Sequence, residues 1–175
     1  MRRGVIRREM NLEFKSPLEY EPGIIAGLLK KSYRELVLSN PKLWRGEEKK
    51  WAEFDDEIFR CPDSVGNCVF LTLLGRWIVG FASYDPRHRP EFGVIGHNCI
   101  LAQFRGRGYG KQQLSEILRC LQSAGIKTAQ ASTSSHPFFI PAQRMYVSCG
   151  FIEVGRRPWD VDPSQNIIEY AKVIG

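Results

Sequence analysis

The sequence predicts an α/β domain with a mixed sheet, and three observations lead to this fold class. Several segments carry apolar residues at the spacing of an amphipathic helix, and short apolar runs bounded by turn residues mark strands. The two kinds of segment follow one another in the order β-α-α-β-β-β-α-β-α-β-β, which is typical of a sheet covered by helices. The length of 175 residues suits a single domain over residues 1–175, long enough to bury a sizeable core.

The first third of the chain predicts a weak strand followed by two helices. Residues 8–14 have only a weak strand pattern. Glu21-Pro22 begins a helix, because proline is favoured in a first helical turn. Asn40-Pro41 ends it, because the residue before a proline avoids the helical conformation. A second helix occupies about 47–60, and Cys61-Pro62 follows it.

The middle of the chain predicts a hairpin and a further strand. Residues 67–84 form the hairpin around Gly75-Arg76, a two-residue turn with glycine first, as a type II′ turn prefers. Residues 92–101 form the next strand, in which Gly93 and Gly96 indicate a bend or a close backbone approach.

The second half of the chain predicts helices and strands in alternation. The clearest helix has an apolar stripe that begins at Gly110 and ends before Gly125, where a C-terminal cap belongs. A strand, a helix and two final strands follow, at about 127–133, 141–150, 151–157 and 166–174.

The composition argues against several classes of function, with nucleic-acid binding through the basic arm at 1–10 as the alternative ranked last. Residues 1–10 contribute +3 of the net charge of +6, with four Arg against one Glu, and this basic arm is expected to be disordered. The rest of the chain lacks the basic stripe with interleaved aromatics that indicates nucleic-acid binding. No window of the sequence has the ~18 apolar residues of a membrane span, and the basic arm at 1–10 is not followed by the apolar region of a secretory signal, so we expect a cytoplasmic protein without a membrane partner. The scattered cysteines and histidines predict no metal site.

The most informative segment is Arg105 to Lys111, RGRGYGK, between the strand at 92–101 and the clearest helix. Its glycines allow backbone N–H groups to turn toward a ligand, and the helix N-terminus adds a positive dipole end. Arg105, Arg107 and Lys111 add positive charge. The spacing matches neither a P-loop nor a dinucleotide fingerprint, so ATP and NAD are not supported. The segment predicts a phosphate or pyrophosphate cradle; the alternative is a glycine-rich turn that caps a helix.

With these residues the sequence resembles the GCN5-related N-acetyltransferase (GNAT) superfamily. Arg105-x-x-Gly108-x-Gly110 matches the family motif R/Q-x-x-G-x-G/A, which binds the pyrophosphate of acetyl-CoA. The second signature, A-x-x-x-Y-x-x-x-G-F, matches the segment from Ala142 through Tyr146 to Phe151. The resemblance covers residues 67–157 well and the N-terminal third only by element order.

Two positions depart from the family pattern. Phe139 stands where the family often has an asparagine that contacts the CoA arm, and Ala102 stands where a proline is common. Neither departure removes the pyrophosphate site, although Phe139 leaves one cofactor hydrogen bond without its usual partner.

The resemblance implies a three-layer GNAT-like domain, with a mixed, mostly antiparallel sheet flanked by helices. It implies direct transfer of the acetyl group of acetyl-CoA, the cosubstrate, to a primary amine, either a small amine or a protein amino group. The alternative is a non-catalytic acyl-CoA-binding or regulatory domain. The oligomeric state stays open, a homodimer included. The residues implied in acetyl-CoA binding are Ile100, Leu101, Arg105, Gly106, Arg107, Gly108, Tyr109, Gly110 and Lys111.

The resemblance also implies Tyr146 as the acid that protonates the leaving thiolate, because its phenol has a proton to donate. A core tyrosine is the alternative that helical spacing alone would favour. The general base is undetermined: the candidates are Glu91, His97, Asn98, His136 and a chain of water molecules. The family usually shapes its acceptor site from the N-terminal helices and the last hairpin, which here offer Trp44, Glu47, Glu48, Trp51, Trp159, Asp160 and Asp162.

Overall fold

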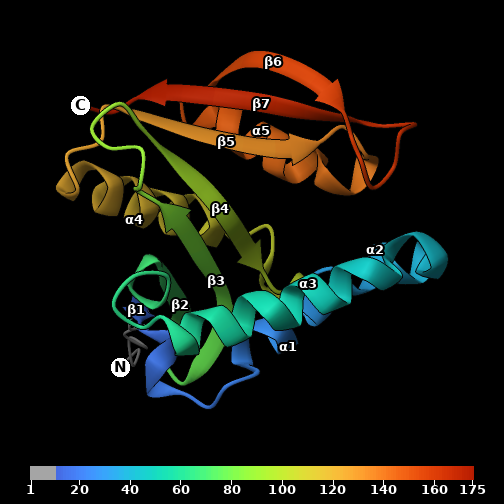
Figure 1. The fold of residues 1–175 in the computed structure, drawn as a ribbon, viewed down its shortest axis with the longest axis horizontal. Helices are drawn as coiled ribbons and strands as arrows, with labels where there is room; N and C mark the ends of the chain where they lie inside the picture. The colour runs from blue at the N-terminus through green and yellow to red at the C-terminus, as the bar shows by residue number, and fades with distance from the viewer. Residues whose placement is uncertain (1–10) are drawn as a thin grey trace, which may run out of the picture.

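The computed structural model of the protein describes residues 11–175. The basic arm at 1–10, with the start of the strand expected at 8–14, lies outside the described residues. Within the described part, seven strands form one sheet in the order β1-β2-β3-β4-β5-β7-β6 (Figure 1). Neighbouring strands are antiparallel except β4 and β5, which are parallel. The expected mixed, mostly antiparallel sheet is therefore confirmed.

The strands are β1 (Leu12–Lys15), β2 (Val69–Leu74), β3 (Trp77–Asp85), β4 (Phe92–Ile100), β5 (Thr128–Ser134), β6 (Ile152–Pro158) and β7 (Asn166–Val173). The helices are α1 (Ile24–Ser32), α2 (Arg34–Ser39), α3 (Pro41–Arg60), α4 (Tyr109–Ser123) and α5 (Ile140–Ser148). A 3-10 turn, η4 (Pro137–Phe139), leads into α5. None of the helices in residues 11–175 combines the length and the apolar character that crossing a membrane requires.

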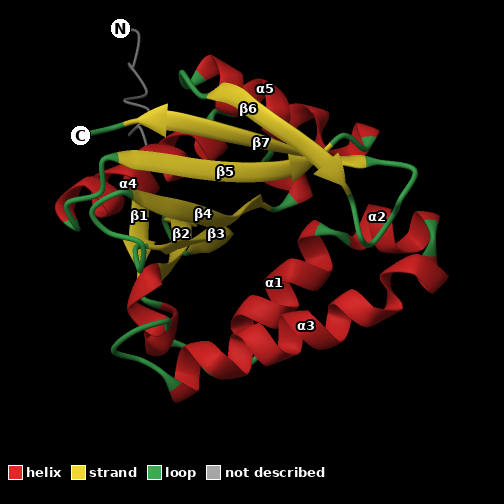
Figure 2. Ribbon diagram, turned by 45° about the horizontal axis from the view of Figure 1, so that its top comes forward, coloured by secondary structure: helices red, strands yellow, loops and turns green. Residues whose placement is uncertain are grey.

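The sheet lies between two layers of helices (Figure 2). On one face, apolar side chains of α1 and α3 pack against β2, β3 and the end of β4, with Ile25, Leu29 and Phe81 fully buried. On the other face, α4 and α5 pack against β4, β5 and β7, with Leu114 and Ile117 fully buried. The predicted three-layer arrangement is therefore confirmed.

The N-terminal helices differ from the prediction in number and bounds. The first begins at Ile24 and not at Pro22, because Gly23 takes a left-handed φ of +95° immediately before it. The helix is interrupted at Tyr33, which caps the end of α1 and the beginning of α2. Pro41 ends α2 as predicted, but it also begins α3 six residues earlier than expected, with the Asn40 side chain accepting the N–H of Leu43. The elements predicted between residues 67 and 174 all agree with the structure to within two residues at each end.

Asp55, from the C-terminal half of α3, caps the N-terminus of α1. Its carboxylate accepts the backbone N–H groups of Gly23 (2.6 Å), Ile25 (2.7 Å) and Ala26 (3.1 Å), and only 2% of the residue is exposed. A helix begins with N–H groups that have no partner within the helix, and a negative charge there also complements the helix dipole. Asp55 therefore fixes the position of α1 on α3.

We expect Asp55→Asn to lower the free energy of unfolding by about 2 kcal/mol, because an amide offers one acceptor oxygen and no charge to three buried donors. Urea denaturation measures this change. The control is Asp56→Asn, at an exposed position on the same helix, which should change stability by less than about 0.5 kcal/mol. Equal losses in the two variants would show that this cap contributes little.

Candidate functional site

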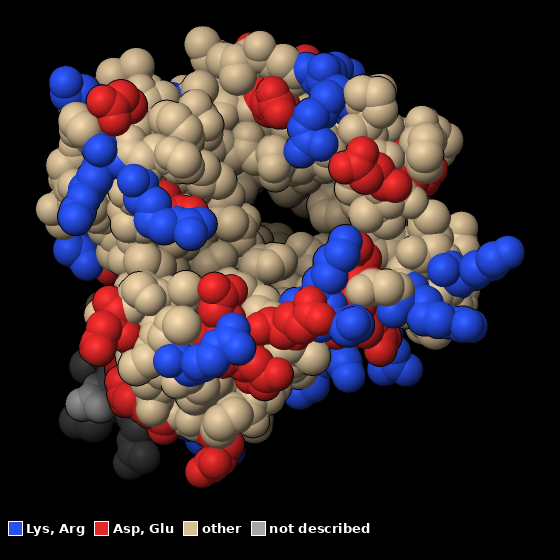
Figure 3. Space-filling view, in the orientation of Figure 1, with Lys and Arg blue, Asp and Glu red and all other residues tan. Residues whose placement is uncertain are grey.

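Strands β4 and β5 pair only over their first residues and then diverge. Phe92, Gly93 and Val94 pair with residues 128–130, whereas β4 continues to Ile100 and β5 to Ser134. In the space-filling view the surface is hollowed between the far end of β4, the β5–α5 side and α3 (Figure 3). Past Val94, the backbone groups of β4 that point toward β5 have no strand partner, so those that make no other hydrogen bond are available to a ligand.

The N–H of Ile100 is one of these available groups. The neighbouring N–H of Leu101 donates to the carbonyl of Val79 in β3 at 2.8 Å. Because successive residues of a strand point their backbone groups to opposite sides, the N–H of Ile100 points away from β3 toward the hollow. Leu101 has both backbone groups paired, since its carbonyl accepts from Phe104 at 2.9 Å. Ile100, and not Leu101, therefore presents the free donor.

The loop 105–111 takes the conformation that its glycines predict. Gly106 and Gly108 have left-handed φ angles of +74° and +81°, and an added Cβ at either position would meet no atom within 4 Å. Glycine is thus required here for the backbone conformation and not for space. Gly108 stands at the N-cap of α4 without a side-chain cap, so the N–H groups of the first turn are left for an anion.

The side chain of Arg105 connects three segments of the chain. Its Nε donates to the carbonyl of Ile100 (2.9 Å) and its Nη2 to the carbonyl of Ser32 (2.8 Å). The guanidinium also lies over the ring of Phe138, 5.5 Å from the centroid. Arg105 therefore joins the end of β4, the end of α1 and the turn before α5. We refer to this arrangement as the Arg105 clasp.

The two other cations of the loop make fewer hydrogen bonds than the Arg105 guanidinium. Arg107 and Lys111 are exposed, and the Arg107 guanidinium makes only a long contact of 3.5 Å to the carbonyl of Gln103. Both side chains can move toward a phosphate without breaking a structural contact. Of the three expected cations, these two fit an anion-binding role.

Tyr146 lies on α5, and its ring is packed in the core. The ring stacks on Tyr170 with centroids 5.6 Å apart and meets Phe151 edge to face at 5.3 Å. The residue is 4% exposed. Burial raises the pKa of its phenol well above 10, and the nearby Cys99 adds to this shift. The phenol is therefore protonated at neutral pH, as a proton donor must be.

Tyr33 and Cys99 form a neutral polar pair beside Ile100, and the sequence analysis did not predict it. The Cys99 Sγ is 3.7 Å from the Tyr33 hydroxyl. Burial raises the pKa of the Cys99 thiol to about 11, although Tyr33 and Arg105 oppose the shift, and burial likewise raises the pKa of Tyr33. The hydroxyl of Ser32, also buried, has no hydrogen-bond partner among the described residues. Neither Tyr33 nor Cys99 therefore carries a charge at neutral pH.

Two candidate bases on β4 are partly buried and contact other side chains. His97 packs against Phe54 and Phe81, with ring centroids 5.3 and 5.6 Å apart, and burial lowers its pKa to about 4. The Asn98 side chain accepts a hydrogen bond of 2.5 Å from Gln113. His97 therefore sits in the α1–α3 core, as a structural histidine does, and Asn98 is an amide without basic character.

The other two candidate bases fit the role no better. The Nδ1 of His136 accepts the N–H of Phe138 at 3.1 Å, so the proton of the neutral imidazole is on Nε2 and that nitrogen can only donate. Glu91 is exposed just before β4, at the opposite end of the strand from Ile100. None of these four side chains is well placed to act as a general base, so a chain of water molecules is the candidate that is left.

Gln113 is a structural residue of the site that the sequence analysis missed. It is fully buried on α4, where it donates to the carbonyl of Phe81 (2.9 Å) and to Asn98, and it accepts from Thr72 at 2.5 Å. These hydrogen bonds connect α4 to β2, β3 and β4. The signal was present, because Gln113 occupies a position of the apolar stripe in a helix whose other stripe residues are apolar or glycine.

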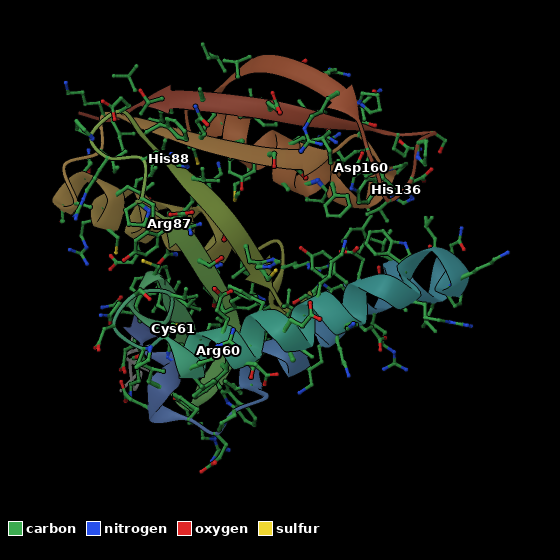
Figure 4. The ribbon with its side chains drawn as sticks, in the orientation of Figure 1. Arg60, Cys61, Arg87, His88, His136 and Asp160 are labelled. Carbon is green, nitrogen blue, oxygen red and sulfur yellow. The ribbon has the colours of Figure 1, made fainter. Side chains whose placement is uncertain are left out.

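The residues expected at the acceptor site fall into two groups. Trp44 and Trp51 are 5% exposed each, and Glu47 is paired with a lysine of α3 at 2.6 Å. Trp159 and Asp160 lie in the loop between β6 and β7, which reaches α3, since the rings of Trp159 and Trp44 are 5.3 Å apart. Figure 4 places Asp160 at the same end of the molecule as His136.

Glu48 and Asp162, the two further acidic residues expected at the acceptor site, make no hydrogen bond or ion pair with Ile100 or its neighbours in the described part of the chain. Glu48 is exposed on α3. Asp162 accepts the backbone N–H (3.1 Å) and the hydroxyl (2.6 Å) of Ser164 within its own loop, so its carboxylate stabilises that loop.

The solved structures most relevant to this site have the same fold. A protein of Desulfovibrio desulfuricans assigned to the GNAT acetyltransferase family has a TM-score of 0.72 and 19% identity, covering 94% of this chain and 100% of its own. Ard1 from Thermoplasma volcanium has a TM-score of 0.64 and 14% identity, covering 94% and 98%. A streptothricin acetyltransferase assigned in Bacillus anthracis, solved with acetyl coenzyme A, has a TM-score of 0.54 and 16% identity, covering 61% and 63%.

These identities show a shared fold, and the family is shown by the sequence itself. No curated protein sequence matches the chain. Residues 31–151, however, match the acetyltransferase (GNAT) family as a whole, and this span contains the loop 105–111, the free edge of β4 and Tyr146. The chain therefore belongs to the GNAT acetyltransferase family.

Proposed function

We propose that this chain is a single-domain enzyme that transfers the acetyl group of acetyl-CoA directly to a primary amine. The observation that carries the proposal is the arrangement at the end of β4. There, the free N–H of Ile100, the left-handed glycines of the loop and the N-terminus of α4 follow one another within eleven residues, 100–110. This arrangement suits a ligand with a pyrophosphate at one end and an acyl carbonyl at the other.

The described residues fit acetyl-CoA in both charge and conformation. Acetyl-CoA supplies the acetyl group as a thioester. The backbone of Gly106 and Gly108 and the N–H groups of the first turn of α4 would hold its pyrophosphate, with Arg107 and Lys111 as accessible cations. The N–H of Ile100 would donate to the carbonyl oxygen, where negative charge develops.

The transfer forms a carbon–nitrogen bond and breaks a carbon–sulfur bond. The amine must first lose a proton, and for an amine of pKa ~10.4 this costs about 4–5 kcal/mol at pH 7. The leaving sulfur takes a proton from the Tyr146 hydroxyl, which is then reprotonated from solvent. Direct transfer is supported by Cys99, because a thiol whose pKa is raised to about 11 is a poor nucleophile at neutral pH.

The cradle can be tested by calorimetric titration with acetyl-CoA, with ATP and NAD as control ligands. We expect binding of acetyl-CoA alone, and at least ~10-fold weaker binding for Gly108→Asp, because a carboxylate would face the pyrophosphate. Gly125→Asp is the matched control: Gly125 also has a left-handed φ, +78°, and open space around it, but it lies at the other end of α4. Equal affinities of the two variants would contradict the cradle.

Tyr146→Phe tests the proton donor. We expect kcat to fall ~10²-fold or more while the affinity for acetyl-CoA stays unchanged, because only the transferable proton is removed. Tyr170→Phe, which removes the hydroxyl from the ring stacked on Tyr146, should keep most of the activity. Steady-state release of the CoA thiol measures both. A Tyr146→Phe variant with full kcat would leave the phenol as a core residue, and a parent protein that binds acetyl-CoA without turnover would indicate the non-catalytic alternative.

The cations of the loop should separate into two behaviours. Arg107→Ala and Lys111→Ala should each weaken acetyl-CoA binding and reduce its dependence on salt, with little change in the melting temperature. Arg105→Lys keeps the charge but cannot keep the planar fork, so we expect a loss of about 1–3 kcal/mol of stability. Thermal unfolding and titration of the three variants measure this. A stable Arg105→Lys variant would argue against the Arg105 clasp.

A further inference from the structure

We infer that the acceptor is a primary amine carried on an aromatic or large apolar group; the inference rests on the proposed function and names its substrate class. Six aromatic side chains belong to elements that border the hollow in Figures 1 and 3, namely α3, the α1–α2 junction, η4 and the β6–β7 loop. These side chains, which we call the aromatic wall, are Tyr33, Trp44, Trp51, Phe138, Phe139 and Trp159.

The aromatic wall is a continuous series of ring contacts that begins and ends on α3. The centroid distances are 5.4 Å for Trp51–Tyr33, 6.0 Å for Tyr33–Phe138, 6.2 Å for Tyr33–Phe139, 6.0 Å for Phe139–Trp159 and 5.3 Å for Trp159–Trp44. The two tryptophans of α3 are buried, whereas the other four members are only partly buried. These four therefore keep ring surface that a ligand can cover.

The aromatic wall starts at the place where the acetyl group would be transferred. The Tyr33 hydroxyl touches the thiol of Cys99, the residue before Ile100. The Arg105 guanidinium bonds to the carbonyl of Ile100 and lies over the ring of Phe138. An amine placed to attack a carbonyl at the Ile100 N–H thus has its substituent against the partly buried rings.

Charge at this end of the molecule gives little reason to select a polycation. Glu47 is paired with Lys50 at 2.6 Å, and the hydrogen bond that Lys50 donates to Glu47, with a smaller effect of Asp160, raises the pKa of Lys50. Arg105 places a positive charge at the reacting end. The walls of the hollow in Figure 3 are mostly uncharged, with Asp160 at the rim as located in Figure 4. The apolar surface of the aromatic wall is therefore the feature that would select the acceptor.

Apolar surroundings also favour the reactive form of the amine. Removing water from an ammonium group disfavours its charged form and lowers its pKa. An amine that enters along the aromatic wall therefore becomes easier to deprotonate. This helps at a site where none of the four candidate side chains is a good general base.

The test is an acceptor panel with acetyl-CoA, read by release of the CoA thiol. The panel is 2-phenylethylamine, ethylamine, spermidine, and two short peptides that begin with Phe or with Ser. We expect kcat/KM for 2-phenylethylamine to exceed that for ethylamine at least ~10-fold, as burial of one aromatic ring provides. The peptides distinguish the source of the amine: a preference for the Phe peptide over all three small amines indicates a chain terminus, and a preference for 2-phenylethylamine over the Phe peptide indicates a small molecule.

Variants of the aromatic wall link the preference to these rings. Phe139→Ala and Trp159→Ala should bring the ratio of 2-phenylethylamine to ethylamine close to one, mainly through KM. Phe14→Ala is the matched control: Phe14 is a half-buried aromatic on β1 that packs on Phe70, and its loss should leave the ratio unchanged. Calorimetric titration of 2-phenylethylamine into the CoA-saturated protein gives a second readout that requires no turnover.

The outcomes separate this inference from the proposed function. Turnover of amines with equal or higher kcat/KM for ethylamine or spermidine overturns the inference and leaves the proposed function standing. The same ratio in Trp159→Ala, Phe139→Ala and the parent protein also overturns it. Failure to bind acetyl-CoA, or binding without turnover of any amine in the panel, overturns the proposed function and the inference with it.

Discussion

The divergence of β4 from β5 is the constraint on which the whole site depends, and it has a local cause. The pairing of β3 with β4 is irregular between Ala82 and Tyr84. At this point the Ser83 hydroxyl, and not a backbone carbonyl, accepts the N–H of His97 at 2.8 Å. A Cβ on Gly96 would lie 2.5 Å from the same hydroxyl. An irregularity of this kind bends a strand and increases its twist, so β4 turns away from β5 and its second half is left without a partner.

A free strand edge is useful only if the segments around it are held in place, and two distant charged side chains do this for α1. Asp55 satisfies the N–H groups at its start, and Arg105 takes the carbonyl of Ser32 at its end. Both ends of a helix carry unpaired backbone groups, so α1 is fixed at each end by one residue from elsewhere in the chain. Tyr33 follows Ser32 directly, and this is why its hydroxyl is placed beside Cys99.

The sequence was sufficient for the parts of the site that depend on local chemistry. The left-handed glycines 106 and 108, the helix after them and the inward position of Tyr146 all follow from spacing within one or two turns of chain. Asp55 and Arg105 act on residues about 30 and 73 positions away, and no local pattern indicates such pairs. The motif around Arg105 indicated only that this residue adds positive charge to the loop. Its hydrogen bond to the carbonyl of Ser32, far away in the sequence, could not be predicted from that motif. The break between α1 and α2 at Tyr33 was missed because the apolar spacing runs through it without interruption.

The tyrosine and cysteine side chains around the end of β4 are neutral, and this limits how the proposed chemistry can proceed. Burial keeps Tyr33, Cys99 and Tyr146 protonated at neutral pH, so each can donate a proton but none can take one from an ammonium. The nearest charge is the Arg105 guanidinium, which itself disfavours a second cation. In the proposed reaction the acceptor amine can therefore attack only after losing its proton, and dry aromatic surroundings lower the cost of that loss. Under the proposed function, the burial that keeps Tyr146 protonated also favours the neutral form of an acceptor amine, so one environment would serve both ends of the transfer.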